Sequence, residues 1–229
     1  MNDKRNLITY GIVAALALAL FLDLWYFVFV INAEKIPEVD LKIQEFFFSM
    51  RNPGLNVFAR VITEGGYRIV LTALCVLLLI SRYRLQIGVP VTIVALGEYF
   101  LNNIFKNIFE RPRPDEALWL MSEPGFSFPS GHSVASMATY GLLFMLVLKY
   151  VSYSRKRTAV LAACLVLAFL VGLTRIYLGV HYSTDVLAGW FEGIFYISIT
   201  LGAITFIRGS NHAIIFQADP KSRRIENGS

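Results

Sequence analysis

LITYGIVAALALALFLDLWYFVFVI, residues 7–31, is a mostly apolar stretch with a single charged residue, Asp23. A helix needs about 20 such residues to cross the hydrocarbon core of a bilayer. Lys4 and Arg5 precede the stretch, as basic residues precede a signal peptide, but it is longer than the apolar part of a signal peptide and no small-residue cleavage site follows it. Residues 7–31 therefore predict a transmembrane helix that is retained.

Further apolar runs follow this first one along the chain. Four of them are long enough to span a bilayer: 85–105, 133–151, 158–178 and 186–207. The run 68–81 is shorter and by length also fits a buried helix or a re-entrant segment, but we interpret it as a sixth span. With 56% apolar and 16% charged residues, the chain departs from an ordinary soluble domain. We expect an all-α integral membrane fold with six transmembrane helices, residues 1–208.

The segments outside these runs have their own character. Residues 39–50 mix apolar and charged side chains, which predicts a short amphipathic helix at the extracytoplasmic membrane surface. The polar tail 209–229 contains Pro220 and Gly228 and is expected to be a loosely ordered cytoplasmic end. Cys75 and Cys164 lie inside predicted spans, so we interpret them as packing residues rather than as a disulfide or a metal pair.

The distribution of Lys and Arg predicts the orientation of the chain. Six spans put both termini on one side of the membrane, together with the connections 82–84 and 149–157. Of the 21 Lys and Arg residues, twelve lie on that side and nine on the other. By the positive-inside rule the termini are cytoplasmic in a multi-pass protein of the cell membrane. The basic residues form no single stripe, so the net charge of +5 does not indicate nucleic acid binding.

Three polar clusters lie at the ends of predicted spans, all on the extracytoplasmic side. They are KNIFERPRP at 106–114, PSGH at 129–132 and RIYLGVHYSTD at 175–185. Taken singly, each has an ordinary explanation, since basic residues at span ends are usually interfacial anchors and Pro-Ser-Gly commonly starts a helix. Their convergence on one face of the membrane favours a functional site.

The residue types in these clusters are those of a phosphate site. Lys106, Arg113 and Arg175 could surround a dianion, and the planar guanidinium groups suit phosphoryl oxygens. Ser130 and Gly131 stand where a helix begins, so their backbone N–H groups and the helix dipole would favour an anion. His181 has a carboxylate four residues later, Asp185, which can orient its ring if this stretch is helical.

The combined spacing resembles the signature of the type-2 phosphatidic acid phosphatase superfamily. That signature is Lys, six residues, Arg-Pro; then Pro-Ser-Gly-His; then Ser-Arg, five residues, His, three residues, Asp. The residues 106–114, 129–132 and 175–185 match its three parts, with Thr174 where the family often has Ser. The six-span layout extends the resemblance over most of the chain.

The resemblance implies roles for the matching residues. His181 would be the nucleophile, oriented by Asp185, and His132 would donate a proton to the leaving alcohol. The phosphoryl oxygens would be held by Lys106, Arg113, Ser130, Gly131 and Arg175. No metal site, cofactor or protein partner is expected, and the role of Arg111 stays unassigned.

The resemblance also implies a class of substrate. Small six-span bacterial members of the family act on lipids with a terminal phosphate at the outer leaflet. We expect hydrolysis of phosphatidylglycerophosphate first and of undecaprenyl diphosphate as the alternative. Transfer of the phosphoryl group to an alcohol is a further alternative.

Two other predictions concern polar residues within the spans. Glu98, Asn102 and Lys106 follow at four-residue steps, so on a helix they form one polar stripe that leads from the phosphate site into the bilayer. We interpret Glu98 and Asn102 as head-group contacts, with a buried structural hydrogen bond as the alternative. Asp23, Glu98 and Glu192 could instead mark the conduction path of a lipid binder or transporter.

Overall fold

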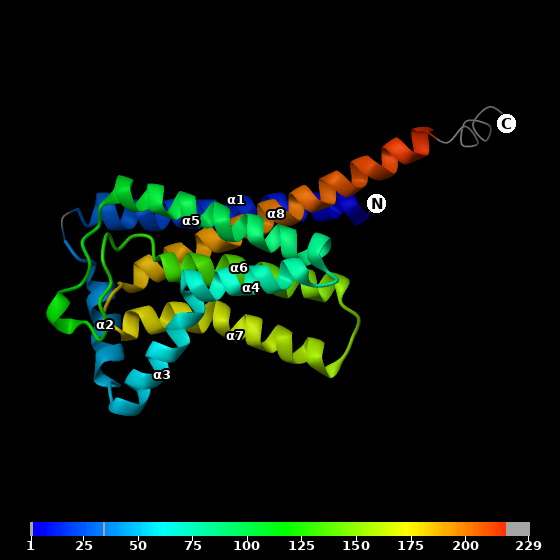
Figure 1. The fold of residues 1–229 in the computed structure, drawn as a ribbon. Coiled ribbons are helices and arrows are strands. Elements are labelled where there is room, and N and C mark those ends of the chain that lie inside the picture. The colour runs from blue at the N-terminus through cyan, green and yellow to red at the C-terminus, as the bar shows by residue number, and fades with distance from the viewer. Residues whose placement is uncertain (1, 34, 219–229) are drawn as a thin grey trace.

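The computed structural model describes residues 2–33 and 35–218, and every regular element within these residues is a helix (Figure 1). Short turns of π-helix extend α1 at Phe27–Ile31 and precede α5 at Arg84–Gly88. The long helices are α1 (Asn2–Tyr26), α5 (Val89–Phe109), α6 (Gly131–Tyr150), α7 (Arg155–Tyr177) and α8 (Ser183–Ala218). The predicted all-α fold is thereby confirmed.

Five stretches of helix are long and apolar enough to cross a membrane. They are Asp3–Ile31, Arg84–Phe109, Gly131–Tyr150, Arg155–Tyr177 and Ser183–Arg208. Each of them covers one of the spans expected from the sequence.

The sixth span is built differently from the others. α4 (Arg68–Ile80) has 13 residues and is therefore only about 20 Å long. It joins the preceding helical stretch Pro53–Gly66 at a bend of 50°, and the two together are apolar and long enough to count as one span. The membrane segment expected at 68–81 is thus the second half of a bent pair.

The connection between α1 and α4 holds two helices where we expected one. α2 (Glu38–Ser49) is the predicted amphipathic helix. α3 (Pro53–Thr63) was not predicted, although its start has clear signals: Asn52 accepts a hydrogen bond from the backbone N–H of Leu55, and Pro53 occupies the first helical position. Residues 53–63 therefore form a helix rather than a loop, and with α4 they make a bent pair that fits a broken span or a re-entrant segment.

The chain segments divide between the two ends of the bundle (Figure 1). The N-terminus, the α6–α7 connection and the C-terminal part of α8 lie at one end, and α2 lies across the other. The loop between α5 and α6 also lies at the α2 end. All three polar clusters belong to this α2 end, because they fall at the end of α5, the start of α6 and the α7–α8 connection.

The last helix runs past the predicted end of the membrane domain at residue 208. α8 continues to Ala218, although its stretch that is apolar enough to cross a membrane ends at Arg208. The division of the chain at residue 208 stays a prediction. The rest of the predicted tail, 219–229, lies outside the described residues.

α6 is the central helix of the bundle. In the most apolar stretch of α6, 67% of the residues are buried, against 17% in that of the first span, Asp3–Ile31. α6 packs on α7 and α8, and Ala138, Leu142 and Leu146 are completely buried in the main apolar cluster. The polar cluster at the start of α6 is therefore held by the most enclosed element of the fold.

Two glycines on α8 allow this helix to approach α6 closely. A Cβ atom at Gly189 would lie 2.8 Å from the carbonyl oxygen of Ser130, and one at Gly193 would lie 2.7 Å from Cβ of Met137. Small residues four apart are a common means of close packing between membrane helices. The contact at Gly189 fixes the distance between the first turns of α6 and α8.

Replacing Gly189 with Ala should push these two first turns apart. Because the clash is with backbone, we expect a loss of about 1–3 kcal/mol of stability and a marked loss of activity. The matched control is Gly97→Ala on α5, where a Cβ atom meets nothing within 4 Å. Thermal denaturation in detergent and phosphatase assays would test this, and a wild-type midpoint and rate for Gly189→Ala would contradict the packing described.

Candidate active site

The His181–Asp185 pair lies at the centre of the α2 end. His181 is in the short α7–α8 connection, and Asp185 is in the first turn of α8. Nδ1 of His181 is 3.3 Å from Oδ2 of Asp185, and both side chains are buried. The predicted contact is present, although His181 itself precedes the helix.

The other nitrogen of the His181 ring faces Arg113. Nη1 of Arg113 is 2.9 Å from Nε2 of His181 and also donates to the carbonyl oxygen of Val180 at 2.7 Å. A guanidinium group can only donate hydrogen bonds, so Nε2 is the acceptor and the ring proton belongs on Nδ1, towards Asp185. This tautomer leaves the lone pair of Nε2 on the side of the cations.

Neighbouring charges and burial shift the pKa of His181 in the same direction. Burial lowers the pKa of His181 well below its ordinary value, and the cations Arg113, Lys106 and Arg175 lower it further. Burial and the like charge of Arg175 lower the pKa of Arg113 to about 10, although the neighbouring carboxylate of Glu123 opposes them. Arg113 therefore stays cationic at neutral pH, whereas the imidazole is neutral.

The three predicted cations gather around this ring from different elements. Lys106, in the last turn of α5, donates to the carbonyl oxygen of Phe126. Arg175, in the last turn of α7, is completely buried and donates to Oγ1 of Thr63 at 2.9 Å. Arg113 comes from the loop after α5. The structure thus brings Lys106, Arg113 and Arg175 to one site, as the sequence predicted.

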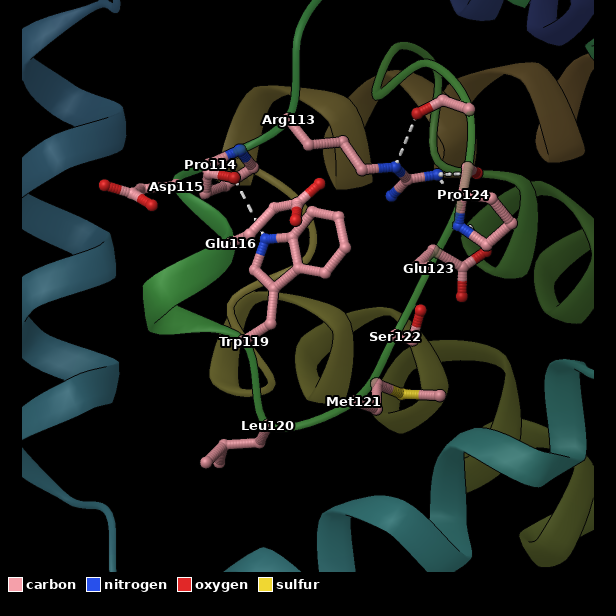
Figure 2. Close-up of a pocket in the computed structure, with 11 residues that line it drawn as sticks. Arg113, Pro114, Asp115, Glu116, Trp119, Leu120, Met121, Ser122, Glu123 and Pro124 are labelled. Atoms are coloured by element: carbon pink, nitrogen blue, oxygen red, sulfur yellow. Dashed lines mark hydrogen bonds and ion pairs between the residues drawn. The ribbon is translucent and has the colours of Figure 1, made fainter.

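A carboxylate that we did not predict lies between the two arginines. Oε2 of Glu123 accepts a hydrogen bond from Nη2 of Arg175, and its Oε1 is 3.8 Å from Nη2 of Arg113. Glu123 belongs to the loop 113–125, which borders a pocket of about 820 Å³ (Figure 2). Arg113 lies at the edge of this pocket, which therefore opens beside the cations.

The start of α6 matches the prediction in part. α6 begins at Gly131 with Ser130 as its N-cap residue. However, the backbone N–H of Ser130 is not free, because it donates to the carbonyl oxygen of Asp185 at 3.0 Å. Of the two amides predicted to bind an anion, that of Gly131 stays available at the helix start.

The second histidine lies in the first turn of α6. The ring of His132 packs edge-on against Tyr67, with 5.0 Å between centroids. Its buried Nε2 atom has no hydrogen-bond partner among the described residues. A polar atom without a partner in a buried position is consistent with a group that meets a ligand.

The polar stripe on α5 reaches the start of α6. Glu98 and Asn102 are buried, and Oδ1 of Asn102 is 3.1 Å from the position of a Cβ atom at Gly131. Glu192 of α8 is also buried and accepts a hydrogen bond from the hydroxyl group of Tyr196 at 2.7 Å. Asp23 is exposed on α1, so it does not join the two buried carboxylates in one path.

Arg111 has buried partners that sequence reasoning missed. It donates to Asp185 and, at 2.8 Å, to Oδ2 of Asp40 on α2. Asp40 is completely buried. In the sequence Asp40 is one of several charged residues of an amphipathic helix, and no local pattern distinguishes it.

A model of the PAP2 superfamily matches residues 87–207, which is more than half of the chain. The chain belongs to the PAP2 superfamily. This is the family that the three motifs predicted.

Individual PAP2 relatives agree in sequence and in fold. Phosphatidylglycerophosphatase B of Bacillus subtilis is 31% identical over 80% of this chain and 92% of its own. An undecaprenyl-diphosphatase of Sulfolobus acidocaldarius is 26% identical over 77% of this chain and 84% of its own. The crystal structure of a transmembrane PAP2-type phosphatidylglycerolphosphate phosphatase from Bacillus subtilis aligns with a TM-score of 0.73 at 31% identity, over 83% of this chain and 96% of that one. These findings confirm the predicted class of protein, a membrane lipid phosphatase.

The contacts of Glu123 predict competition with any anion that enters the site. The carboxylate of Glu123 takes part of the hydrogen-bonding capacity of Arg175. While Glu123 holds the arginine, an anion cannot bind there, so the apparent affinity for the anion falls by the fraction of molecules in which the site is blocked. We expect Glu123→Gln to bind vanadate about tenfold more tightly. Inhibition of p-nitrophenyl phosphate hydrolysis would measure this, with the exposed Glu116→Gln of the same loop as the matched control. Weaker vanadate binding by Glu123→Gln would show instead that the carboxylate orients the arginines.

Proposed function

We propose that this phosphatase hydrolyses phosphatidylglycerophosphate to phosphatidylglycerol through a phosphohistidine on His181. The proposal is carried by the orientation of the His181 ring. Nδ1 faces the carboxylate of Asp185, while Nε2 faces the cations. A neutral ring in this orientation has its nucleophilic lone pair where a phosphate group would be held.

The first chemical step forms a bond between Nε2 of His181 and phosphorus. The bond between phosphorus and the glycerol oxygen breaks, and the leaving oxygen takes a proton from His132. Asp185 stabilises the positive charge that develops on the imidazole ring as this bond forms. Arg113, now hydrogen-bonded to Nε2, turns its guanidinium group to the phosphoryl oxygens when substrate enters.

The second step releases phosphate. Water attacks phosphorus, the bond to Nε2 breaks, and His132 takes the proton of the water molecule. Phosphoryl transfer depends mainly on positioning and on stabilisation of charge on the equatorial oxygens. In this site Lys106, Arg113 and Arg175 supply the charge, with the hydroxyl group of Ser130 and the backbone N–H of Gly131 as further donors.

Two observations support phosphatidylglycerophosphate as the substrate. The relative with the higher identity bears its name, and so does the aligned crystal structure. The pocket beside Arg113 gives an extended head group room next to the cations. We further propose that Glu98 and Asn102 contact the head group or the glycerol, since both are buried and Asn102 lies next to Gly131 at the start of α6. Undecaprenyl diphosphate is the alternative substrate, since a relative of lower identity is named for it.

We also propose that the site faces the extracytoplasmic side and that both termini are cytoplasmic. The support is the excess of Lys and Arg at the end of the bundle opposite the site, in the connections 82–84 and 149–157 and near the termini. Substrate then reaches the site from the outer leaflet.

Replacing each of the two histidines should reduce activity in a different way. His181→Ala removes the covalent route, so we expect loss of activity on every substrate. His132→Ala removes a general acid, worth roughly 10²- to 10⁴-fold. That loss should appear with phosphatidylglycerophosphate, whose leaving alkoxide needs a proton, and be much smaller with p-nitrophenyl phosphate.

The assay compares phosphatidylglycerophosphate, phosphatidic acid and undecaprenyl diphosphate on purified protein in the presence of a chelator. We expect the first to be hydrolysed fastest and the chelator to have no effect. A rapid quench without acid should trap labelled phosphate on the wild type but not on His181→Ala. If His132→Ala loses the covalent label and His181→Ala keeps it, the two roles are exchanged.

Cysteine labelling tests the orientation. Cys75 and Cys164 are buried and can be replaced, and single cysteines are then placed at Ser122 beside the site and at Tyr153 at the opposite end, both of which are exposed. In intact cells an impermeant thiol reagent should label position 122 and leave position 153 unlabelled until the membrane is opened. The reverse pattern would invert the topology.

A further inference from the structure

The buried ion pair between Arg111 and Asp40 links the surface helix α2 to His181 and Asp185. Arg111 lies immediately after α5, and its two terminal nitrogens bind different carboxylates. Nη1 donates to Oδ1 of Asp185, and Nη2 donates to Oδ2 of Asp40 at 2.8 Å. The side chains of all three residues are at most 4% exposed.

The two oxygens of Asp185 are divided between different partners. Oδ1 receives Arg111, whereas Oδ2 receives the backbone N–H of Tyr182 at 2.8 Å and faces His181. A planar guanidinium group fixes the plane of a carboxylate more strictly than a flexible ammonium group does. Arg111 thereby keeps Oδ1 away from the imidazole ring and Oδ2 towards it.

Arg111 is itself held on its other sides. Its guanidinium carbon lies 4.4 Å from the centroid of the Tyr182 ring, and Nη1 also donates to Oγ1 of Thr184 at 2.8 Å. Burial alone would oppose its charge, but Asp185 and Asp40 outweigh that effect and hold the pKa of Arg111 above its ordinary value. Arg111 is therefore a fixed cation between two carboxylates.

Asp40 uses both of its oxygens to join α2 to the start of α8. Oδ1 accepts from Oγ of Ser183 at 2.6 Å and from the backbone N–H of Thr184 at 2.9 Å. Oδ2 accepts from Oγ1 of Thr184 at 2.7 Å in addition to Arg111. A carboxylate at the first turn of a helix also interacts favourably with the helix dipole. Asp40 is thus a cap for α8 supplied by a distant helix.

We propose that Arg111 and Asp40 are positioning residues for the nucleophile: Arg111 orients and partly neutralises Asp185, and Asp40 fixes Arg111 from α2. The inference rests on the proposed role of His181 as the nucleophile and adds two residues to that site. Neither residue touches the reacting phosphate. They act through Asp185 on the orientation and basicity of the His181 ring.

The charges of Arg111 and Asp40 should shift the pKa of His181 in opposite directions. Arg111 weakens the field of Asp185, so its removal strengthens the carboxylate and raises the pKa of His181. Asp40 partly cancels Arg111, so its removal has the reverse effect. The other charged and titratable groups facing His181 are unchanged in both variants: Lys106 of α5, Arg113 of the following loop, His132 of α6 and Arg175 of α7.

The experiment measures kcat/KM against pH for p-nitrophenyl phosphate with the purified full-length chain. Only the neutral imidazole attacks phosphorus, so activity falls as pH drops through the pKa of His181. In Arg111→Gln we expect this acid limb to move to higher pH and kcat to fall on the order of 10- to 100-fold, as for other groups that orient a catalytic residue from outside. In Asp40→Asn the limb should stay or move to lower pH. Arg111→Lys keeps the charge, so the limb should stay near that of the wild type although kcat falls.

Matched controls separate positioning from a general loss of charge or of fold. Glu38→Gln removes a carboxylate from the exposed side of the same helix α2, and Arg155→Gln removes an exposed arginine at the start of α7, at the opposite end of the bundle. Both should keep the wild-type rate and acid limb. Thermal denaturation in detergent reports folding, and the double variant Arg111→Gln/Asp40→Asn should recover part of any stability lost by Arg111→Gln, since it leaves no unpaired carboxylate at position 40.

The outcomes are distinct. A wild type that forms no phosphohistidine would remove the proposed function on which the inference rests. A wild type that forms one, with the acid limb of Arg111→Gln unchanged or moved to lower pH, would overturn the positioning role even if the rate falls. The same holds if Asp40→Asn moves the limb upward as Arg111→Gln does.

Discussion

The buried carboxylate of Asp185 is the constraint on which the α2 end of the bundle depends. Burying a charge is costly unless it is paired and hydrogen-bonded, so each of its oxygens requires partners. Those partners come from separate segments: Arg111 after α5, Ser127 before α6, and Tyr182 and His181 before α8. The backbone of the same residue receives the N–H of Ser130. One residue, through its side chain and its backbone carbonyl, therefore joins all three polar motifs.

This constraint explains why polar groups can be enclosed at the end of an apolar bundle. The spans are held by apolar packing around α6 and by the close approach of α8 at Gly189. Both contacts lead into the first turns of α6 and α8, where His132 and Asp185 are placed. His132 and Asp185 are thus positioned by helix starts, whereas Lys106 and Arg175 lie in the last turns of α5 and α7. The loop between α5 and α6 then closes the site with Arg113.

Much of the fold followed from the sequence because length and hydropathy decide what can cross a bilayer. The spacing of the motifs likewise predicted that Lys106, Arg113, Arg175 and the two histidines belong to one site, and the structure gathers the three cations around His181. The bent span was harder, since the 13 residues of α4 are too few alone and α3 resembles a surface segment. Only the structure shows that a helix precedes α4 and joins it at a bend of 50°.

The residues that escaped prediction are those whose role depends on contacts distant in the chain. Asp40 is separated from its partner Thr184 by 144 positions, and on its own helix it resembles a solvated charge. Ser130 stands at a helix start, but its N–H is taken by Asp185, which sequence spacing does not reveal. Arg111 is two residues from Arg113 and of the same type, yet they face opposite sides of the His181–Asp185 couple. Local patterns identify the type of such groups, and the tertiary fold decides their partner.

The two carboxylates next to the site cations differ in how firmly they are held. Asp185 lies on a helix, is fully buried and has partners at both oxygens, so its position is fixed by the fold. Glu123 lies on a loop, is 17% exposed, and is attached through Arg175 and, more distantly, Arg113. A dianionic phosphate can offer the arginines more acceptor oxygens and more charge than one carboxylate. We therefore expect an entering phosphate group to displace Glu123 from the arginines, while Asp185 keeps its place beside His181.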